Sequence, residues 1–171
     1  MAAPGSPRVG VFTLGGTIAM RPASAGGAVP SLPATDLLAA IPVLEHEDLE
    51  LAIREVTNKP GASLSIGELL GLADQIRTAL EEGCAGAIVI QGTDTIEETA
   101  WLLDLVIDSG SPVAVTGAMR NPSLAGADGP ANILAAIRVA ASQAARGLGT
   151  LVVMNDQIHA ARWVQKTHTV Q

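Results

Sequence analysis

Short apolar runs alternate with longer amphipathic segments along most of this chain of 171 residues. Four runs of β-branched and small apolar residues, at 9–13, 87–90, 112–116 and 150–154, are too short for helices, so each predicts a buried strand. A further strand is expected over 49–56. Strands that alternate with helices favour the α/β class, and we predict a three-layer, doubly wound, mainly parallel sheet of the Rossmann-like kind, with right-handed crossovers.

Sequence signals mark where the intervening helices begin. Ser65-Ile66-Gly67-Glu68 and Thr95-Ile96-Glu97-Glu98 both have the form of a capping box, in which the first and last side chains each bond a backbone N–H. Asp128-Gly129-Pro130 places a proline in the first turn of another helix. A short helix is expected over 35–41, where Pro42 ends it.

Two segments lack this periodicity. The stretch 21–33 is rich in Gly, Pro and Ala and predicts a long mobile loop, of the kind that often acts as a lid. The residues after 154 form a polar tail that contains Lys166. Because the tail follows a strand, we expect it to emerge at the carboxyl edge of the sheet. Since the length fits one domain and the sequence has no internal repeat, we predict one domain over 1–171.

Composition and charge narrow the range of partners. A chain of this length buries roughly 70% of its surface on folding, and its apolar residues can supply the core. The net charge is −7 and the Lys and Arg residues form no run, so we expect no nucleic-acid partner. No stretch approaches the ~20 apolar residues of a membrane span and the first residues lack a signal-peptide pattern. We therefore expect a cytoplasmic protein with a small polar ligand and no membrane partner.

Neither a metal nor an organic cofactor is predicted. His46, His159 and His168 lack the spacing of metal ligands, and no metal site is expected. The Gly-x-Gly-x-x-Gly and P-loop patterns of dinucleotide and nucleoside-triphosphate sites are absent. Cys84, the only cysteine, precedes an apolar strand, which is typical of a buried structural thiol.

Two hydroxyl-rich turns carry the candidate chemistry. Leu14-Gly15-Gly16-Thr17-Ile18-Ala19 and Gln91-Gly92-Thr93-Asp94-Thr95 each follow a predicted strand directly. The carboxyl ends of parallel strands line one crevice, so Thr17, Thr93 and Asp94 are expected to converge there. A threonine hydroxyl becomes a nucleophile only beside a base, and Lys166 in the tail would reach the same crevice. Taken singly, each turn is also explained as an ordinary glycine turn or a helix cap.

Five blocks of the sequence, taken together and in order, resemble the bacterial L-asparaginases. The blocks are Thr13-Leu14-Gly15-Gly16-Thr17-Ile18-Ala19, Gln91-Gly92-Thr93-Asp94-Thr95-Ile96-Glu97-Glu98-Thr99-Ala100, Thr116-Gly117-Ala118-Met119-Arg120, Ala127-Asp128-Gly129-Pro130-Ala131-Asn132 and Val152-Val153-Met154-Asn155-Asp156, followed by Lys166-Thr167. The resemblance extends from residue 9 to the end and is weak over 21–63. It implies the amino-terminal catalytic domain of an amidohydrolase that acts on a small amino-acid amide, L-asparagine in the first place, without a cofactor.

The resemblance also implies roles for single residues. Thr17 would attack the side-chain amide carbon, giving a β-aspartyl enzyme and ammonia, and water would then resolve the ester. Thr93, Asp94 and Lys166 would form a second catalytic group, in which an unprotonated Lys166 accepts a proton and Asp94 also holds the substrate α-amino group. Backbone N–H groups near Thr93 and Ala118 are the oxyanion candidates. The implied substrate contacts are Gly16, Ser63, Gly92, Asp94 and Ala118.

The chain departs from the family pattern at three points. It has no tyrosine, whereas the lid of the family carries one. Only Ser63 stands where the family has a Ser-Gln pair for the substrate α-carboxylate. The family also has a second, smaller carboxy-terminal domain, which lends a glutamate to a neighbouring site in a dimer or tetramer; we expect the sequence to represent the amino-terminal domain alone and to be a poor catalyst by itself. An amidase subunit of a tRNA-dependent amidotransferase and a non-catalytic amino-acid-binding domain stay open as alternatives.

Overall fold

The computed structural model describes residues 5–16, 18, 20–22, 28–30, 33–122 and 124–168. Within these residues a sheet of six strands has the order β4-β1-β5-β6-β7-β8. Its strands are β1 (Arg8–Thr13), β4 (Glu50–Glu55), β5 (Gly86–Ile90), β6 (Val113–Thr116), β7 (Thr150–Met154) and β8 (Gln157–Ala160). Neighbouring strands of this sheet run parallel except β7 and β8, which pair antiparallel.

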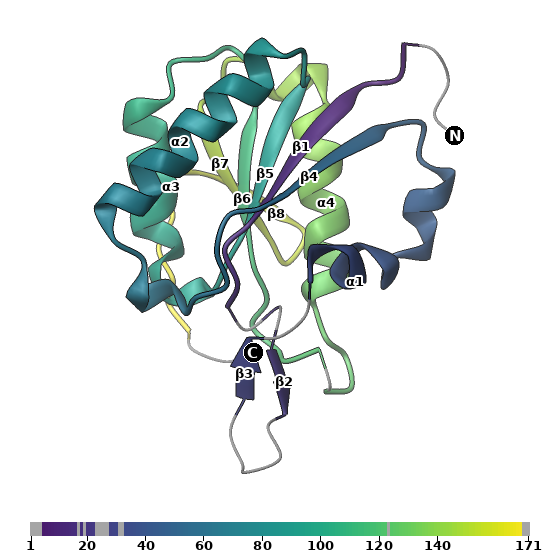
Figure 1. Cartoon of the computed structure of the whole chain (residues 1–171), viewed down its shortest axis with the longest axis vertical. Helices are drawn as coiled ribbons and strands as arrows, with labels where there is room; N and C mark the ends of the chain where they lie inside the picture. Colours follow the sequence, from purple (N-terminus) through teal and green to yellow (C-terminus); the bar gives the residue numbers. More distant parts are fainter. Residues whose placement is uncertain are drawn as a thin grey trace.

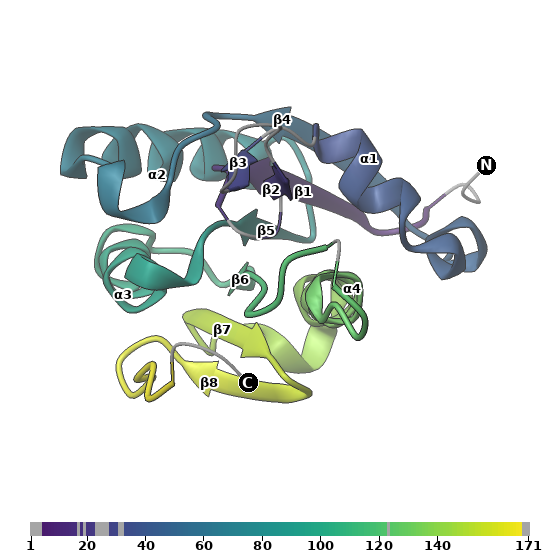
Figure 2. The same cartoon turned by 90° about the horizontal axis from the view of Figure 1, so that it is seen from below.

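Helices cover both faces of the sheet (Figures 1 and 2). On one face lie α2 (Ile66–Glu81) and α3 (Ile96–Val106), and on the other lie α1 (Ala34–Ala39) and α4 (Gly129–Ala141). Short 3₁₀ turns connect them: η2 (Pro42–His46), η3 (Gly61–Ser63), η4 (Thr93–Thr95) and η5 (Gln143–Ala145). This arrangement confirms the predicted three-layer, mainly parallel α/β fold. None of the described helices is long and apolar enough to cross a bilayer.

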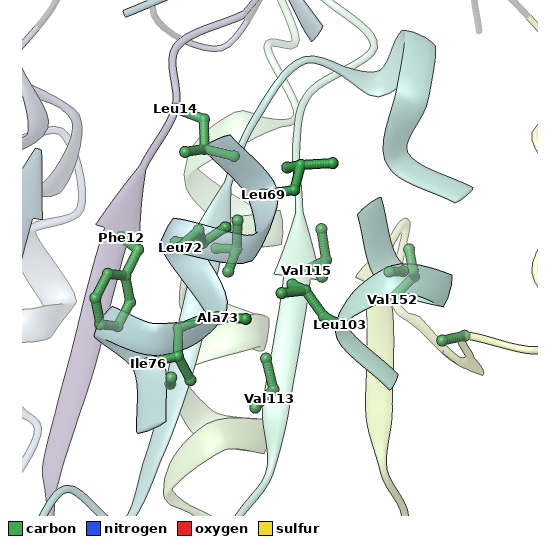
Figure 3. Close-up of a cluster of buried hydrophobic side chains, with 14 of the residues drawn as sticks. Phe12, Leu14, Leu69, Leu72, Ala73, Ile76, Leu103, Val113, Val115 and Val152 are labelled. Carbon is green, nitrogen blue, oxygen red and sulfur yellow. The ribbon is translucent and has the colours of Figure 1, made fainter. Parts of the chain in front are cut away.

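Each face of the sheet buries its own apolar cluster. Phe12 of β1 packs with Leu72 and Ile76 of α2, as Figure 3 shows, whereas its neighbour Val11 packs on the opposite side with Ile137 of α4. Successive side chains of a strand point to opposite faces, so a strand covered on both sides needs apolar residues throughout. That requirement explains why the central strands were visible in the sequence as continuous apolar runs.

The two predicted capping boxes have different outcomes. The box at the start of α2 is present: Ser65 Oγ accepts from the Glu68 N–H at 3.2 Å, and the Ser65 N–H donates to Glu68 at 2.9 Å. Hydrogen bonds from Lys59 and from Ser65 together lower the pKa of Glu68 to about 2. The prediction at Thr95 is wrong, although α3 does begin at Ile96. Thr95 belongs to η4 and its φ and ψ are −127° and 29°, outside the extended region that a capping residue needs.

Segments predicted to lack regular structure contain strands. The polar tail contains β8, which a two-residue turn at Asn155 and Asp156 joins to β7. Both residues have positive φ, 51° and 58°, which the turns of tight hairpins require and which Asn and Asp tolerate. In the predicted lid, β2 (Met20–Pro22) pairs antiparallel with β3 (Ala28–Pro30), beyond the carboxyl ends of the main strands in Figure 1. Residues 23–27 and 31–32 of that predicted loop lie outside the described residues.

Cys84 is buried, as its sequence context predicted. It is 5% exposed and packs in the cluster beneath α2. Burial raises the pKa of its thiol, because the thiolate would lose its hydration. The reactive thiolate form is therefore disfavoured, which fits a structural role.

Candidate active site

The turns after β1 and β5 meet at the carboxyl edge of the sheet. Thr13 at the end of β1 pairs with Ile90 at the end of β5, and the Leu14 N–H donates to the Ile90 carbonyl at 2.9 Å. Two residues further on, the backbones of Gly16 and Gly92 lie in direct contact. Thr17, the predicted nucleophile, lies outside the described residues, so its role stays a prediction.

Gly16 is required by the close approach of these two turns. Its φ is +91°, in the left-handed region, and a Cβ built on it would lie 2.1 Å from the Gly92 nitrogen. A side chain there would therefore be strained and would also collide with backbone that cannot swing away. The glycine thus allows the turn after β1 to lie against the turn that precedes Thr93.

We expect Gly16→Ala to lower the free energy of unfolding by about 2–5 kcal/mol, the sum of left-handed strain and a backbone clash. Gly71→Ala is the matched control, because Gly71 lies inside α2 with nothing within 4 Å of its added Cβ. That variant is expected to gain about 0.5–1 kcal/mol from helix propensity. Chemical denaturation measures both. A Gly16→Ala protein as stable as the wild type would contradict the observed packing.

Thr93, Asp94 and Lys166 come together in space, as the sequence predicted. Lys166 Nζ donates to Thr93 Oγ1 at 2.9 Å and lies 3.3 Å from Asp94 Oδ1. Thr93 is buried, the Lys166 side chain is 19% exposed and the Asp94 side chain is 72% exposed. The amine thus joins a buried hydroxyl to a carboxylate that faces solvent. An amine beside a hydroxyl can take up or return its proton, which is the basis of general acid–base catalysis.

Glu97 holds the tail that delivers Lys166. The Lys166 N–H donates to the Glu97 carboxylate, which extends from the first turn of α3. A turn after β8, in which the N–H groups of Trp163 and Val164 both bond the Ala160 carbonyl, directs the chain back toward this helix. Sequence reasoning missed this role of Glu97, because the residue falls within a pattern that has the form of a capping box.

The other predicted contact residues surround Thr93. Ala118 is buried and follows Gly117, whose added Cβ would lie 2.6 Å from the Gln91 carbonyl oxygen and 3.0 Å from the Thr93 methyl carbon. On the other side, η3 packs against η4, and Ser63 is the exposed last residue of η3. The structure therefore brings Gly16, Gly117 beside Ala118, and the turn of Ser63 against the segment 91–95. Their roles as substrate contacts stay predictions.

A cavity of about 220 Å³ opens beside Lys166. Its lining includes Thr93, Met119, Asn155 and His159. Among the described residues, no three His, Cys, Asp or Glu side chains lie close enough together to hold a metal ion. The Lys166 amine and the Thr93 hydroxyl are suited to proton transfer and to hydrogen bonding with a small polar molecule.

Comparisons of the sequence and of the structure with known proteins both find asparaginases. The family model described as Asparaginase, N-terminal matches residues 8–171. L-asparaginase 2-3 of Saccharomyces cerevisiae is 40% identical over 94% of this chain and 45% of its own length, and the L-asparaginase of Bacillus licheniformis is 38% identical over 94% and 50%. The crystal structure of a probable cytoplasmic L-asparaginase from Campylobacter jejuni superposes with a TM-score of 0.87 at 33% identity, over 96% of this chain and 49% of that one. The chain spans about half the length of these relatives.

Proposed function

The chain belongs to the asparaginase family, and from that premise we propose that it forms the catalytic amino-terminal part of an amidohydrolase that converts L-asparagine to L-aspartate and ammonia. The observation that carries the proposal is the contact of Lys166 Nζ with Thr93 Oγ1 at 2.9 Å, at the carboxyl edge of the sheet. Ligands of open α/β sheets bind at this edge. We also propose a cytoplasmic location, the one stated for the Campylobacter jejuni relative.

In the proposed reaction, Thr17 is the nucleophile. Its oxygen forms a bond to the side-chain amide carbon, and its proton passes to the amide nitrogen, which leaves as ammonia. The product is a β-aspartyl ester of Thr17. Water then attacks the ester carbon, aspartate leaves, and the Thr17 oxygen regains a proton. This assignment rests on the sequence resemblance, and the position of Gly16 against Gly92 supports it by bringing the two turns together.

The pair of Thr93 and Lys166 manages the protons in this scheme. A neutral Lys166 amine has a lone pair to accept a proton and two N–H groups to donate. Through the Thr93 hydroxyl it removes a proton from the attacking water and returns it at the next step. Asp94, which lies 3.3 Å from the same nitrogen, keeps its exposed carboxylate available for the α-amino group of the substrate.

Backbone groups complete the proposed site. The N–H groups near Thr93 and Ala118 stabilise the negative charge that develops on the amide oxygen, and Ser63 contacts the substrate α-carboxylate. Since the relatives are about twice as long as this chain, we propose that full turnover needs a second half, joined to the chain or added as a separate polypeptide. In that form we propose a homo-oligomer, a dimer or tetramer.

Ammonia release from L-asparagine and L-glutamine tests the proposal. The 171-residue chain is assayed alone and fused to the carboxy-terminal half of the Bacillus licheniformis relative, and the faster of the two is called the active form. We expect the fusion to be the active form, with kcat for asparagine in the usual enzyme range of about 1–10³ s⁻¹. If L-aspartate binds but neither the chain alone nor the fusion releases ammonia, the proposal is contradicted and an amino-acid-binding domain is favoured.

A further inference from the structure

Asp128 begins α4 without capping it. As the residue before the helix it makes no side-chain capping bond. Its carboxylate instead accepts from two successive backbone N–H groups of the loop after β6, Met119 at Oδ2 and Arg120 at Oδ1, both at 2.9 Å. A carboxylate that accepts two backbone N–H groups is a strong anchor, because both bonds are charge-assisted. The loop directly after Ala118 is thus tied to the start of α4.

Asn132 extends this anchor one turn along α4. It is 3% exposed, and its Nδ2 donates to the Gly117 carbonyl at 3.0 Å and to Asp128 Oδ2 at 3.1 Å. Its Oδ1 accepts from the Asn155 N–H, in the turn between β7 and β8, at 2.9 Å. Both polar atoms of this buried amide are therefore paired. A fully paired buried network is rigid, whereas one that loses a member leaves costly unpaired groups.

Ala118 lies between the two anchored groups. The Gly117 carbonyl before it bonds Asn132, and the Met119 N–H after it bonds Asp128. The same loop packs on Thr93, because a Cβ on Gly117 would lie 3.0 Å from the Thr93 methyl carbon. Met119 and Asn155 also line the cavity beside Lys166. The network thus fixes the backbone on one wall of the site.

We propose that Asp128 and Asn132 are positioning residues for amide hydrolysis: they hold the loop 117–120 so that the backbone at Ala118 is preorganised to stabilise the charge that develops on the amide oxygen. This inference rests on the proposed function. Preorganised donors act mainly in the transition state, where that charge is largest. Loosening the loop therefore lowers kcat and leaves KM nearly unchanged. A smaller folded fraction would lower the apparent kcat in the same way, so kcat is calculated per folded protein and local exchange at the loop is measured beside it.

Two substitutions break the network from different ends. Asp128→Asn puts an NH₂ group opposite one of the two backbone N–H groups, and an NH₂ group cannot accept a hydrogen bond from that N–H. Asn132→Ala removes the bonds to Gly117, Asp128 and Asn155 together, and Asp128→Asn keeps the test available if Asn132→Ala fails to fold. Glu68→Gln is the matched control, since Glu68 is another carboxylate at the start of a helix that accepts a backbone N–H, and its helix α2 covers the opposite face of the sheet from α4.

The test combines amide hydrogen exchange with steady-state ammonia release by the active form. In Asp128→Asn we expect exchange at Met119 and Arg120 to quicken by about tenfold or more. We expect kcat to fall by about 10–100-fold, a smaller fall than removal of a whole oxyanion donor causes. KM should stay within about threefold of the wild-type value. Glu68→Gln should change neither.

Three outcomes would overturn the inference: unchanged exchange at Met119 and Arg120, faster exchange with unchanged kcat, or an equal loss of kcat in Glu68→Gln. Failure of the proposed function is recognised separately. If the wild-type active form releases no ammonia, the proposed function is wrong, and the role assigned to the network is wrong with it. If the wild type is active and the variants are equally active, only the role of the network is wrong.

Discussion

Lys166→Met is expected to lower kcat of the active form by about 10³-fold, the contribution typical of a general acid–base group. Methionine approximates the length of the lysine stem but has no amine to exchange a proton with Thr93, 2.9 Å away. Binding should change much less, because the substrate contacts proposed at Gly16, Ser63 and Asp94 remain. Steady-state ammonia release and calorimetric titration with L-aspartate measure the two effects separately.

Lys59→Met is the control for this change. Lys59 forms a salt bridge with Glu68 at the surface, 2.6 Å between Nζ and Oε1, and its side chain is not among the proposed site residues. We expect its kcat to stay within about twofold of the wild type. Near-normal turnover in Lys166→Met would rule out the proton transfer proposed for Thr93 and Lys166.

Thr17→Ala and Thr93→Ala are each expected to lower kcat by on the order of 10³ or more, and the double variant should be little worse than either alone. The reason is that the nucleophile and the proton-transfer pair act as one unit, so the second substitution removes a pathway that has already been lost. Rate measurements on both single variants and the double variant test this, with thermal unfolding to show that each protein is folded.

Thr95→Ala is the matched control for the threonine variants. It lies in the same turn as Thr93, and its hydroxyl oxygen is buried without a hydrogen-bond partner among the described residues. We expect kcat within about threefold of the wild type. A Thr17→Ala protein that keeps more than about a tenth of wild-type activity would exclude Thr17 as the nucleophile.

The central strands could be predicted because a buried strand requires a continuous run of apolar residues, which is visible in the sequence. Strands such as Gly86–Ile90 are covered on both faces, so every residue in them is small or apolar. β8 (Gln157–Ala160) was missed because its residues are exposed or half-buried and form no apolar run. Its signal was the pair Asn155-Asp156, which suits a tight hairpin turn but is informative only when a strand is already expected on both sides.

The site was predictable where it depends on strand ends and less so where it depends on distant contacts. Thr93 and Asp94 follow a buried strand, so their edge of the sheet could be inferred from local pattern. The local pattern assigns Glu97 and Asp128 to the starts of helices. In the structure, the Glu97 carboxylate accepts from the backbone N–H of Lys166, 69 residues away. The Asp128 carboxylate accepts from the backbone N–H groups of Met119 and Arg120, 8–9 residues away. Local patterns show that a carboxylate stands at a helix start, but tertiary structure decides which N–H group it accepts.

The most direct test of whether the chain cleaves an amide through a threonine ester is to identify the product that forms from L-asparagine in the presence of hydroxylamine. Hydroxylamine competes with water for an acyl-enzyme and would convert the β-aspartyl ester to β-aspartyl hydroxamate. We expect the active form to release ammonia and to yield hydroxamate in proportion to the hydroxylamine concentration, with none from Thr17→Ala. Ammonia release with aspartate as the sole product at every hydroxylamine concentration would contradict the ester intermediate, and the absence of ammonia would contradict the proposed activity itself.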